Sequence, residues 1–174
     1  MAGVGGGEPG RSPMSTPTRP DLSLELVSNP IYLCAVREMI NLSAKRLGFA
    51  DNAASQVALA VDEAIVNVMK HGYDKKLDGR IWLRLTPVGE PVEAVEIVIE
   101  DEARQVEPCD IKGRDLEDIR PGGLGVHIIR EVMDEVKYEK RPGAAGMRLT
   151  MTKRRASEKA TANSRPNPCT NCDC

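Results

Sequence analysis

Aromatic residues are scarce in this sequence of 174 residues, which contains one Trp, one Phe and three Tyr. A buried core must therefore be built from aliphatic side chains, and an apolar content of 41% is enough for one such core. Neither sign of charge is in excess, because the formal net charge is only -2. Bulk electrostatics thus gives no reason to expect binding to nucleic acid or to a membrane surface.

Long hydrophobic runs are also absent. No apolar stretch approaches the roughly 20 residues of a transmembrane helix, and the N-terminus, rich in Gly, Pro, Ser and Thr, has no apolar signal core. We therefore expect a cytoplasmic protein. The five cysteines are odd in number and no secretion signal precedes them, so a disulfide framework is not expected.

The two ends of the chain lack the apolar residues that packing requires. Residues 1–20 and 154–174 are predicted to be disordered, which leaves a folded domain at residues 21–153. Three thiols crowd the C-terminal tail, at Cys169, Cys172 and Cys174. Without a nearby histidine they make an incomplete zinc site. We interpret them as part of a solvated tail, and a zinc ion shared between two chains is the alternative.

Hydrophobic periodicity predicts the secondary structure of the domain. Strands are expected at residues 22–26, 80–86, 93–100, 136–140 and 147–153. Helices are expected at residues 30–47 after a cap at Ser28 or Asn29, at 52–72 with a cap at Asp51 or Asn52, and at 126–135. Residues 101–121 have no clear period, which is typical of a lid or binding loop. This order predicts an α+β fold, a two-layer α/β sandwich with three helices on one face of a mixed, mostly antiparallel sheet.

The stretch from Val61 to Gly72 contains the most informative residues. Glu63, Asn67 and His71 follow one another in steps of four, which places them on one face of a helix. A carboxylate can accept a hydroxyl proton, and an amide oxygen is a suitable ligand for Mg²⁺. The pattern therefore indicates a phosphate-handling site, although a histidine at a helix end is more often structural.

Two further features lie later in the chain. The glycines of Gly122-Gly123-Leu124-Gly125 precede the third helix, where free N–H groups favour an anion such as phosphate. Asp101 ends a strand and can accept a hydrogen bond from an exocyclic amine such as that of adenine. Each feature alone is more often a simple turn, so both gain weight only in combination with Glu63 and Asn67.

In this order the three features resemble the GHKL superfamily of ATPases and kinases, and most closely the bacterial anti-sigma-factor serine kinases. The stretch from Ala60 to Asn67 with Lys70-His71-Gly72-Tyr73 is similar to the first ATP-binding box. Asp101 is similar to the aspartate of the second box, and Gly123-Leu124-Gly125-Val126 to the third. The likeness covers about residues 22–153.

The resemblance implies a role for each of these residues. Asn67 would ligate Mg²⁺, Glu63 would be the general base toward a substrate serine, and Asp101 would accept from the adenine amino group of ATP. The third box and the lid would hold the phosphates through Gly123, Leu124, Gly125 and Val126, and through one of Lys112, Arg114 and Arg120.

The resemblance also implies a function. The chain would be a serine/threonine-protein kinase that uses ATP and Mg²⁺ to phosphorylate an anti-anti-sigma (STAS-type) partner, and it would regulate transcription by also binding a sigma factor. A homodimer would form through the strand and helix before residue 48.

One position departs from the family pattern. The second box usually continues Asp-x-Gly, but here Ala103 follows Asp101 and Glu102. If the family uses a positive φ at this position, alanine is strained there by about 1 kcal/mol or more. Either the turn differs or nucleotide affinity is lower. The second reading leads to a different class of function, a regulatory module that acts by protein binding alone.

Overall fold

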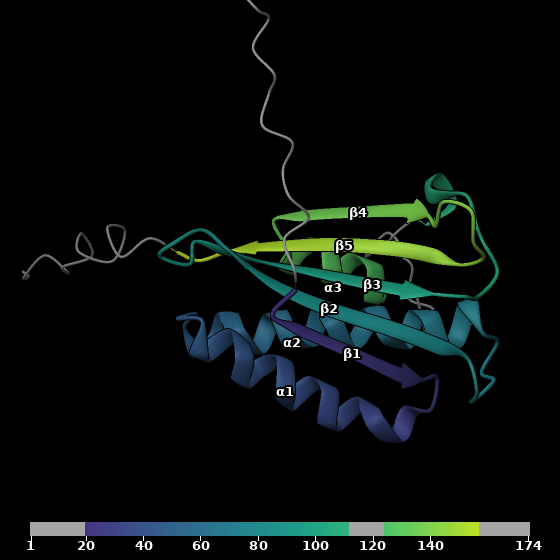
Figure 1. The fold of residues 1–174 in the computed structure, drawn as a ribbon, viewed down its shortest axis with the longest axis horizontal. Helices are drawn as coiled ribbons and strands as arrows, with labels where there is room; N and C mark the ends of the chain where they lie inside the picture. Colours follow the sequence, from purple (N-terminus) through teal and green to yellow (C-terminus); the bar gives the residue numbers. More distant parts are fainter. Residues whose placement is uncertain (1–19, 112–123, 157–174) are drawn as a thin grey trace, which may run out of the picture.

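The computed structural model describes residues 20–111 and 124–156, which form a five-stranded sheet with its helices on one face (Figure 1). The strands are β1 (Leu22–Val27), β2 (Arg80–Val88), β3 (Ala94–Asp101), β4 (Glu135–Lys140) and β5 (Met147–Arg154). The helices are α1 (Leu33–Arg46), α2 (Asp51–Asn67) and α3 (Leu124–Val132), with short turns η1 (Pro30–Tyr32), η2 (Val68–Gly72) and η3 (Pro108–Asp110). Both predicted tails lie almost entirely outside the described residues.

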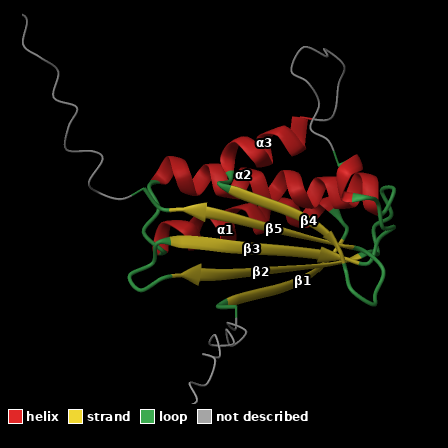
Figure 2. Cartoon of the chain, turned by 90° about the horizontal axis from the view of Figure 1, so that it is seen from above, coloured by secondary structure: helices red, strands yellow, loops and turns green. Residues whose placement is uncertain are grey.

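The strand order is β1-β2-β3-β5-β4, and all four described pairings are antiparallel. Side chains alternate across the sheet, so Val95, Ile97 and Ile99 of β3 all lie buried against the helices. Figure 2 shows the three helices on this one side of the sheet. The predicted two-layer α+β fold is confirmed.

The apolar stripes of the helices close the core. Val36, Ile40 and Ala44 of α1 are buried, and so are Val57, Val61 and Ile65 of α2. None of these side chains is aromatic, as the composition requires. Among the described residues, no helix has the length and apolar character to cross a membrane.

Of the two predicted N-terminal helix caps, one is present in the structure and one is not. Asn29 caps η1 as predicted, because its side chain accepts a hydrogen bond from the Ile31 N–H at 3.1 Å. The prediction of a cap at Asp51 or Asn52 was wrong, because the capping position is Ala50, which makes no side-chain cap. Asp51 is instead the first residue of α2, where the helix dipole favours its charge, and it pairs with Lys45 at 2.9 Å.

Several element ends differ from the prediction, and three of them are informative. The helix expected to reach Gly72 changes at Val68 into the π turn η2. Strand β2 continues through Pro87, beyond the strand predicted at residues 80–86. Because β1 pairs with β2 only as far as Leu85, the missing N–H of this proline faces an open edge of the sheet. Helix α3 ends at Val132, earlier than expected, because Glu135 already pairs with β5.

Candidate functional site

The first half of the site is the contact between α2 and the start of α3. Glu63 and Asn67 lie one turn apart on α2, and both face Gly125 in the first turn of α3. A Cβ at Gly125 would lie 2.7 Å from Glu63 Oε2 and 3.1 Å from Asn67 Nδ2. Glycine is therefore required here for close approach, and it brings a carboxylate and an amide against the backbone of a helix N-terminus.

The Asn67 side chain carries the clearest sign of a missing ligand. Its Nδ2 atom is buried and has no hydrogen-bond partner within the described ranges. An unpaired buried donor costs about 1–3 kcal/mol. A bound anion could accept from this amide, and the amide oxygen is a ligand that Mg²⁺ accepts. The site therefore fits the Mg²⁺·nucleotide expected from the sequence.

The second half of the site is a cavity of about 390 Å³ beside Asn67. Its polar lining includes Asn67, His71 and Asp101. Apolar side chains form most of the remaining wall: Ala64, Val68, Ile99, Val106, Ile111, Val126, Met147 and Leu149. An apolar pocket of this size with a few convergent polar groups is typical of a small-molecule or cofactor site.

Asp101 lines this cavity and is only 4% exposed. Burial raises the pKa of its carboxyl group, although the N–H groups of Ala103 and Met147 lower it by donating to Oδ1 at 2.8 and 3.3 Å. Both of these bonds use the same oxygen. Among the described contacts, Oδ2 is thus the atom that remains to accept from a ligand.

The turn after Asp101 shows whether Ala103, in place of the usual glycine, strains the backbone. Ala103 does not have a positive φ; among the described non-glycine residues only Asp74 and Lys75 do. Its N–H instead closes a small turn on the Asp101 carboxylate. The alanine therefore carries no left-handed strain, and of the two alternatives the structure favours a different turn.

Ala103 is buried against Gly72, the last residue of the π turn. A Cβ at Gly72 would lie 2.8 Å from the Ala103 Cβ, closer than real Cβ contacts allow. The two small residues are therefore complementary, and together they bring the end of the second helix against the segment that follows Asp101.

We predict that Gly72→Ala destabilises the protein by about 1–2 kcal/mol through this collision. Adding Ala103→Gly removes the opposing methyl group and should recover about half of the loss or more. Urea unfolding of the two single variants and the double variant measures the coupling. Strictly additive effects would show that the two positions do not contact each other.

The structure brings five of the predicted residues together: Glu63, Asn67, Asp101, Gly125 and Val126. Leu124 opens α3 but its side chain is 53% exposed and does not line the cavity. The remaining predicted contacts, Gly123, Arg120 and the alternative lid cations Lys112 and Arg114, lie outside the described residues.

His71 and Tyr138 also line the cavity. His71 had been interpreted as a helix end, and the π turn places it beside Asn67. Tyr138 had been overlooked, and burial raises its pKa. Strand alternation could have identified it, because Val136 and Tyr138 share the face of β4 that packs against the core.

Comparisons with known proteins agree with this geometry. A family model described as a histidine kinase-like ATPase domain matches residues 26–153. The serine-protein kinase RsbW of Listeria monocytogenes serovar 1/2a is 31% identical over 140 residues, which cover 76% of this chain and 85% of that protein. The serine-protein kinase RsbW of Bacillus subtilis is 26% identical over 141 residues, which cover 76% and 84%.

A solved structure supports the fold. The crystal structure of the RsbU and RsbW domains of Rv1364c from Mycobacterium tuberculosis matches with a TM-score of 0.55 and 20% identity. The match covers 80% of this chain and 33% of that one. The chain therefore belongs to the histidine kinase-like (GHKL-type) ATPase family and, within it, to the RsbW-type serine-protein kinases.

Proposed function

We propose that this chain transfers the γ-phosphoryl group of ATP to a serine of an anti-anti-sigma (STAS-type) protein in the cytoplasm. One observation carries the proposal: Glu63 and Asn67 converge on Gly125, beside a cavity that Asn67 and Asp101 line. Bound ATP·Mg²⁺ supplies the phosphoryl group and the metal charge that stabilises the phosphates.

Different residues at the site would bind different parts of ATP·Mg²⁺. Asn67 would hold Mg²⁺ through its amide oxygen, and Asp101 would accept from the exocyclic amine of adenine through Oδ2. The N-terminal turn of α3, with Gly125 and Val126, would donate N–H groups to phosphate oxygens, and the resemblance assigns the same role to Gly123. The resemblance also assigns Arg120 the role of supplying positive charge to the phosphates.

Glu63 would act on the protein substrate. Its side chain is half-buried, so a serine hydroxyl from a partner can reach it from solvent. The carboxylate would take the hydroxyl proton as the serine oxygen bonds to phosphorus, while the bond from phosphorus to the ADP oxygen breaks. The products are phosphoserine, ADP and a protonated Glu63, which returns its proton to water.

The proposed regulation follows from two competing partners. The chain would bind a sigma factor and hold it from transcription, and the unphosphorylated anti-anti-sigma protein would displace that sigma factor. Phosphorylation of the anti-anti-sigma protein would release it and restore the complex with sigma. This scheme rests on the resemblance of the sequence to the anti-sigma-factor serine kinases.

Two measurements test the proposal. The protein is incubated with labelled ATP, Mg²⁺ and an anti-anti-sigma protein from the same organism, and label should appear on a serine of that protein. Calorimetric titration with ADP and Mg²⁺ should give a saturable heat. No heat at millimolar ADP would favour the alternative module that acts by protein binding alone, although Ala103, which motivated it, carries no backbone strain.

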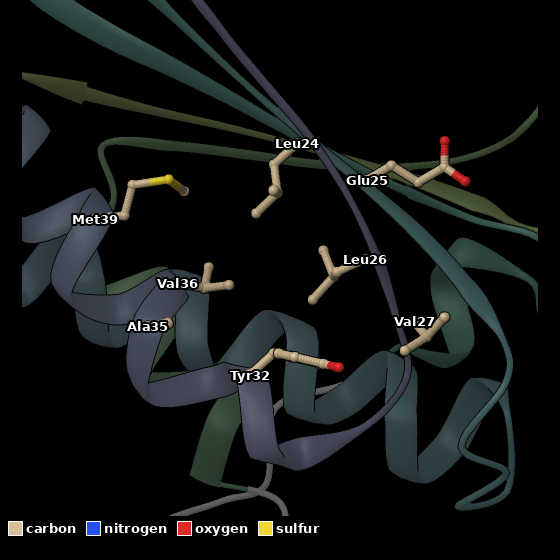
Figure 3. A pocket seen from close by; sticks show the side chains of 8 residues that line it. All are labelled: Leu24, Glu25, Leu26, Val27, Tyr32, Ala35, Val36 and Met39. Carbon is tan, nitrogen blue, oxygen red and sulfur yellow. The ribbon is translucent and has the colours of Figure 1, made fainter.

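A groove between β1 and α1 supports the homodimer that the resemblance implies. It has a volume of about 390 Å³, and Leu24 and Leu26 point from β1 toward Val36 and Met39 of α1 (Figure 3). Tyr32 lines the same groove and is 49% exposed. β1 is an edge strand of the described sheet, so a second copy could cover both the groove and this open edge.

We predict that Tyr32→Glu prevents dimerisation by placing a charge in this groove. Light scattering at micromolar concentration should give a dimer mass for the wild type and a monomer mass for the variant. Leu42→Glu is the matched control, because Leu42 is 57% exposed on the adjoining helix α1 but does not line the groove. A monomeric wild type, or a dimeric Tyr32→Glu variant, contradicts this assignment.

A further inference from the structure

The turn between β4 and β5 lies against the segment that follows Asp101. Arg141 Nη1 donates to the Asp101 carbonyl oxygen at 2.9 Å. Gln105 Nε2, from the segment after Asp101, donates to the Ala144 carbonyl oxygen at 2.9 Å. Lys140 and Glu107 form an ion pair beside these bonds. Hydrogen bonds donated in both directions therefore connect the end of β3 and the segment after it to the β4–β5 turn.

Arg141 itself is held on the face of the sheet that carries no helix. Its guanidinium carbon lies 5.0 Å from the centre of the Trp82 ring, and its Nε lies 4.0 Å from Glu100 Oε1. A cation over an aromatic face and a nearby carboxylate are both attractive. The side chain is only 20% exposed, and the same guanidinium group that contacts Trp82 and Glu100 also donates to the Asp101 carbonyl oxygen.

Glu100 is the charged centre of this cluster. Burial would raise the pKa of its carboxyl group, but hydrogen bonds from Arg148 at 2.7 Å and Arg84 at 2.6 Å outweigh burial and lower it. Glu100 is thus ionised at neutral pH. Glu100 directly precedes Asp101, and its negative charge attracts the Arg141 guanidinium toward this part of β3.

The Asp101 carboxylate accepts hydrogen bonds from two segments that lie on either side of the bond between Arg141 and the Asp101 carbonyl. Its Oδ1 accepts from Ala103, two residues after the carbonyl that Arg141 holds, and from Met147, which follows the β4–β5 turn. The Arg141 bond to the Asp101 carbonyl therefore closes a ring of contacts around this residue. Opening the ring would let the Asp101 peptide rotate and redirect Oδ2.

We propose that Arg141 is a positioning residue for nucleobase recognition, which acts through the Asp101 carbonyl to aim the Asp101 carboxylate at an exocyclic amine. This inference rests on the proposed function. It assigns base specificity to a side chain on the opposite face of the sheet from the helices, anchored by Glu100 and Trp82.

The test compares ADP with IDP, in which a carbonyl oxygen replaces the exocyclic amine of adenine. Calorimetry with Mg²⁺ gives both affinities for the wild type, Arg141→Ala and Arg148→Ala. Arg148→Ala is the matched control, because it also removes a Glu100 partner and one positive charge, and none of the described hydrogen bonds or ion pairs joins Arg148 to Asp101. The wild type should prefer ADP by about tenfold or more, the range expected from one buried hydrogen-bonding group.

Arg141→Ala should reduce the ADP-to-IDP affinity ratio by about five- to tenfold, mostly through weaker ADP binding. Arg148→Ala should keep the wild-type ratio. A merely structural role would weaken both nucleotides equally and leave the ratio unchanged, which would overturn the inference. If circular dichroism shows that Arg141→Ala does not fold, Arg141→Met keeps an unbranched side chain without the guanidinium donors and is measured in its place, with the same expectation.

The outcomes separate this inference from the proposed function. A wild type that binds ADP with the expected preference, with the same preference in Arg141→Ala or Arg141→Met, overturns the inference and leaves the kinase proposal intact. A wild type that binds neither nucleotide contradicts the kinase proposal itself. A wild type that binds both equally removes the role of Asp101, and with it the role of Arg141.

Discussion

Replacing Glu63 with glutamine should slow phosphoryl transfer to the anti-anti-sigma partner by about 10²–10⁴-fold, the usual contribution of a general base. Glutamine has nearly the same shape but cannot take the hydroxyl proton of the substrate serine. ADP affinity should stay within about twofold of the wild type, because the cavity is lined by Asn67 and Asp101 and not by Glu63. Single-turnover transfer from labelled ATP measures the first effect, and calorimetry measures the second.

The control for this variant is Glu96→Gln, the same chemical change on the face of β3 opposite the helices. It should transfer phosphate at the wild-type rate. If Glu63→Gln is as fast as the wild type, Glu63 is not the base. If it loses ADP binding as well as transfer, its role is structural, through the contact with Gly125.

The layers of the fold could be predicted from the sequence because hydrophobic period depends directly on burial. Val95, Ile97 and Ile99 alternate because β3 has one covered face, and Val57, Val61 and Ile65 follow helical spacing because α2 has one buried stripe. Element ends were less predictable. They depend on tertiary pairing, as at Pro87, whose place in β2 is possible only because β1 stops short of it.

The site was predictable where residue chemistry and spacing coincide. Glu63 and Asn67 stand out because polar groups interrupt an otherwise apolar helix face, and Gly125 because glycine before a helix suits close approach. Arg141 could not be identified in this way. It belongs to an ordinary turn in the sequence, and its contact with Asp101 depends on the order of β3 and β5 in the sheet.

Gly146→Ala should be among the most damaging single substitutions in the described part of the chain. A Cβ at this position would lie 1.8 Å from the Asp101 carbonyl oxygen, and the glycine has a φ of +91°, which alanine adopts only with strain. Backbone atoms cannot move aside as a side chain can. We therefore expect a loss of about 3 kcal/mol or more in the free energy of unfolding, measured by urea denaturation.

Gly143→Ala separates the two causes, because Gly143 lies in the same turn with a φ of +67° and has nothing within 4 Å of the Cβ position. It carries the conformational cost without the collision, so it should lose only about 1 kcal/mol. Equal losses in the two variants would mean that the turn alone, and not its contact with Asp101, sets the stability. A larger loss in Gly146→Ala, together with weaker ADP binding in the fraction that folds, would show that the β4–β5 turn and the Asp101 end of the cavity form one unit.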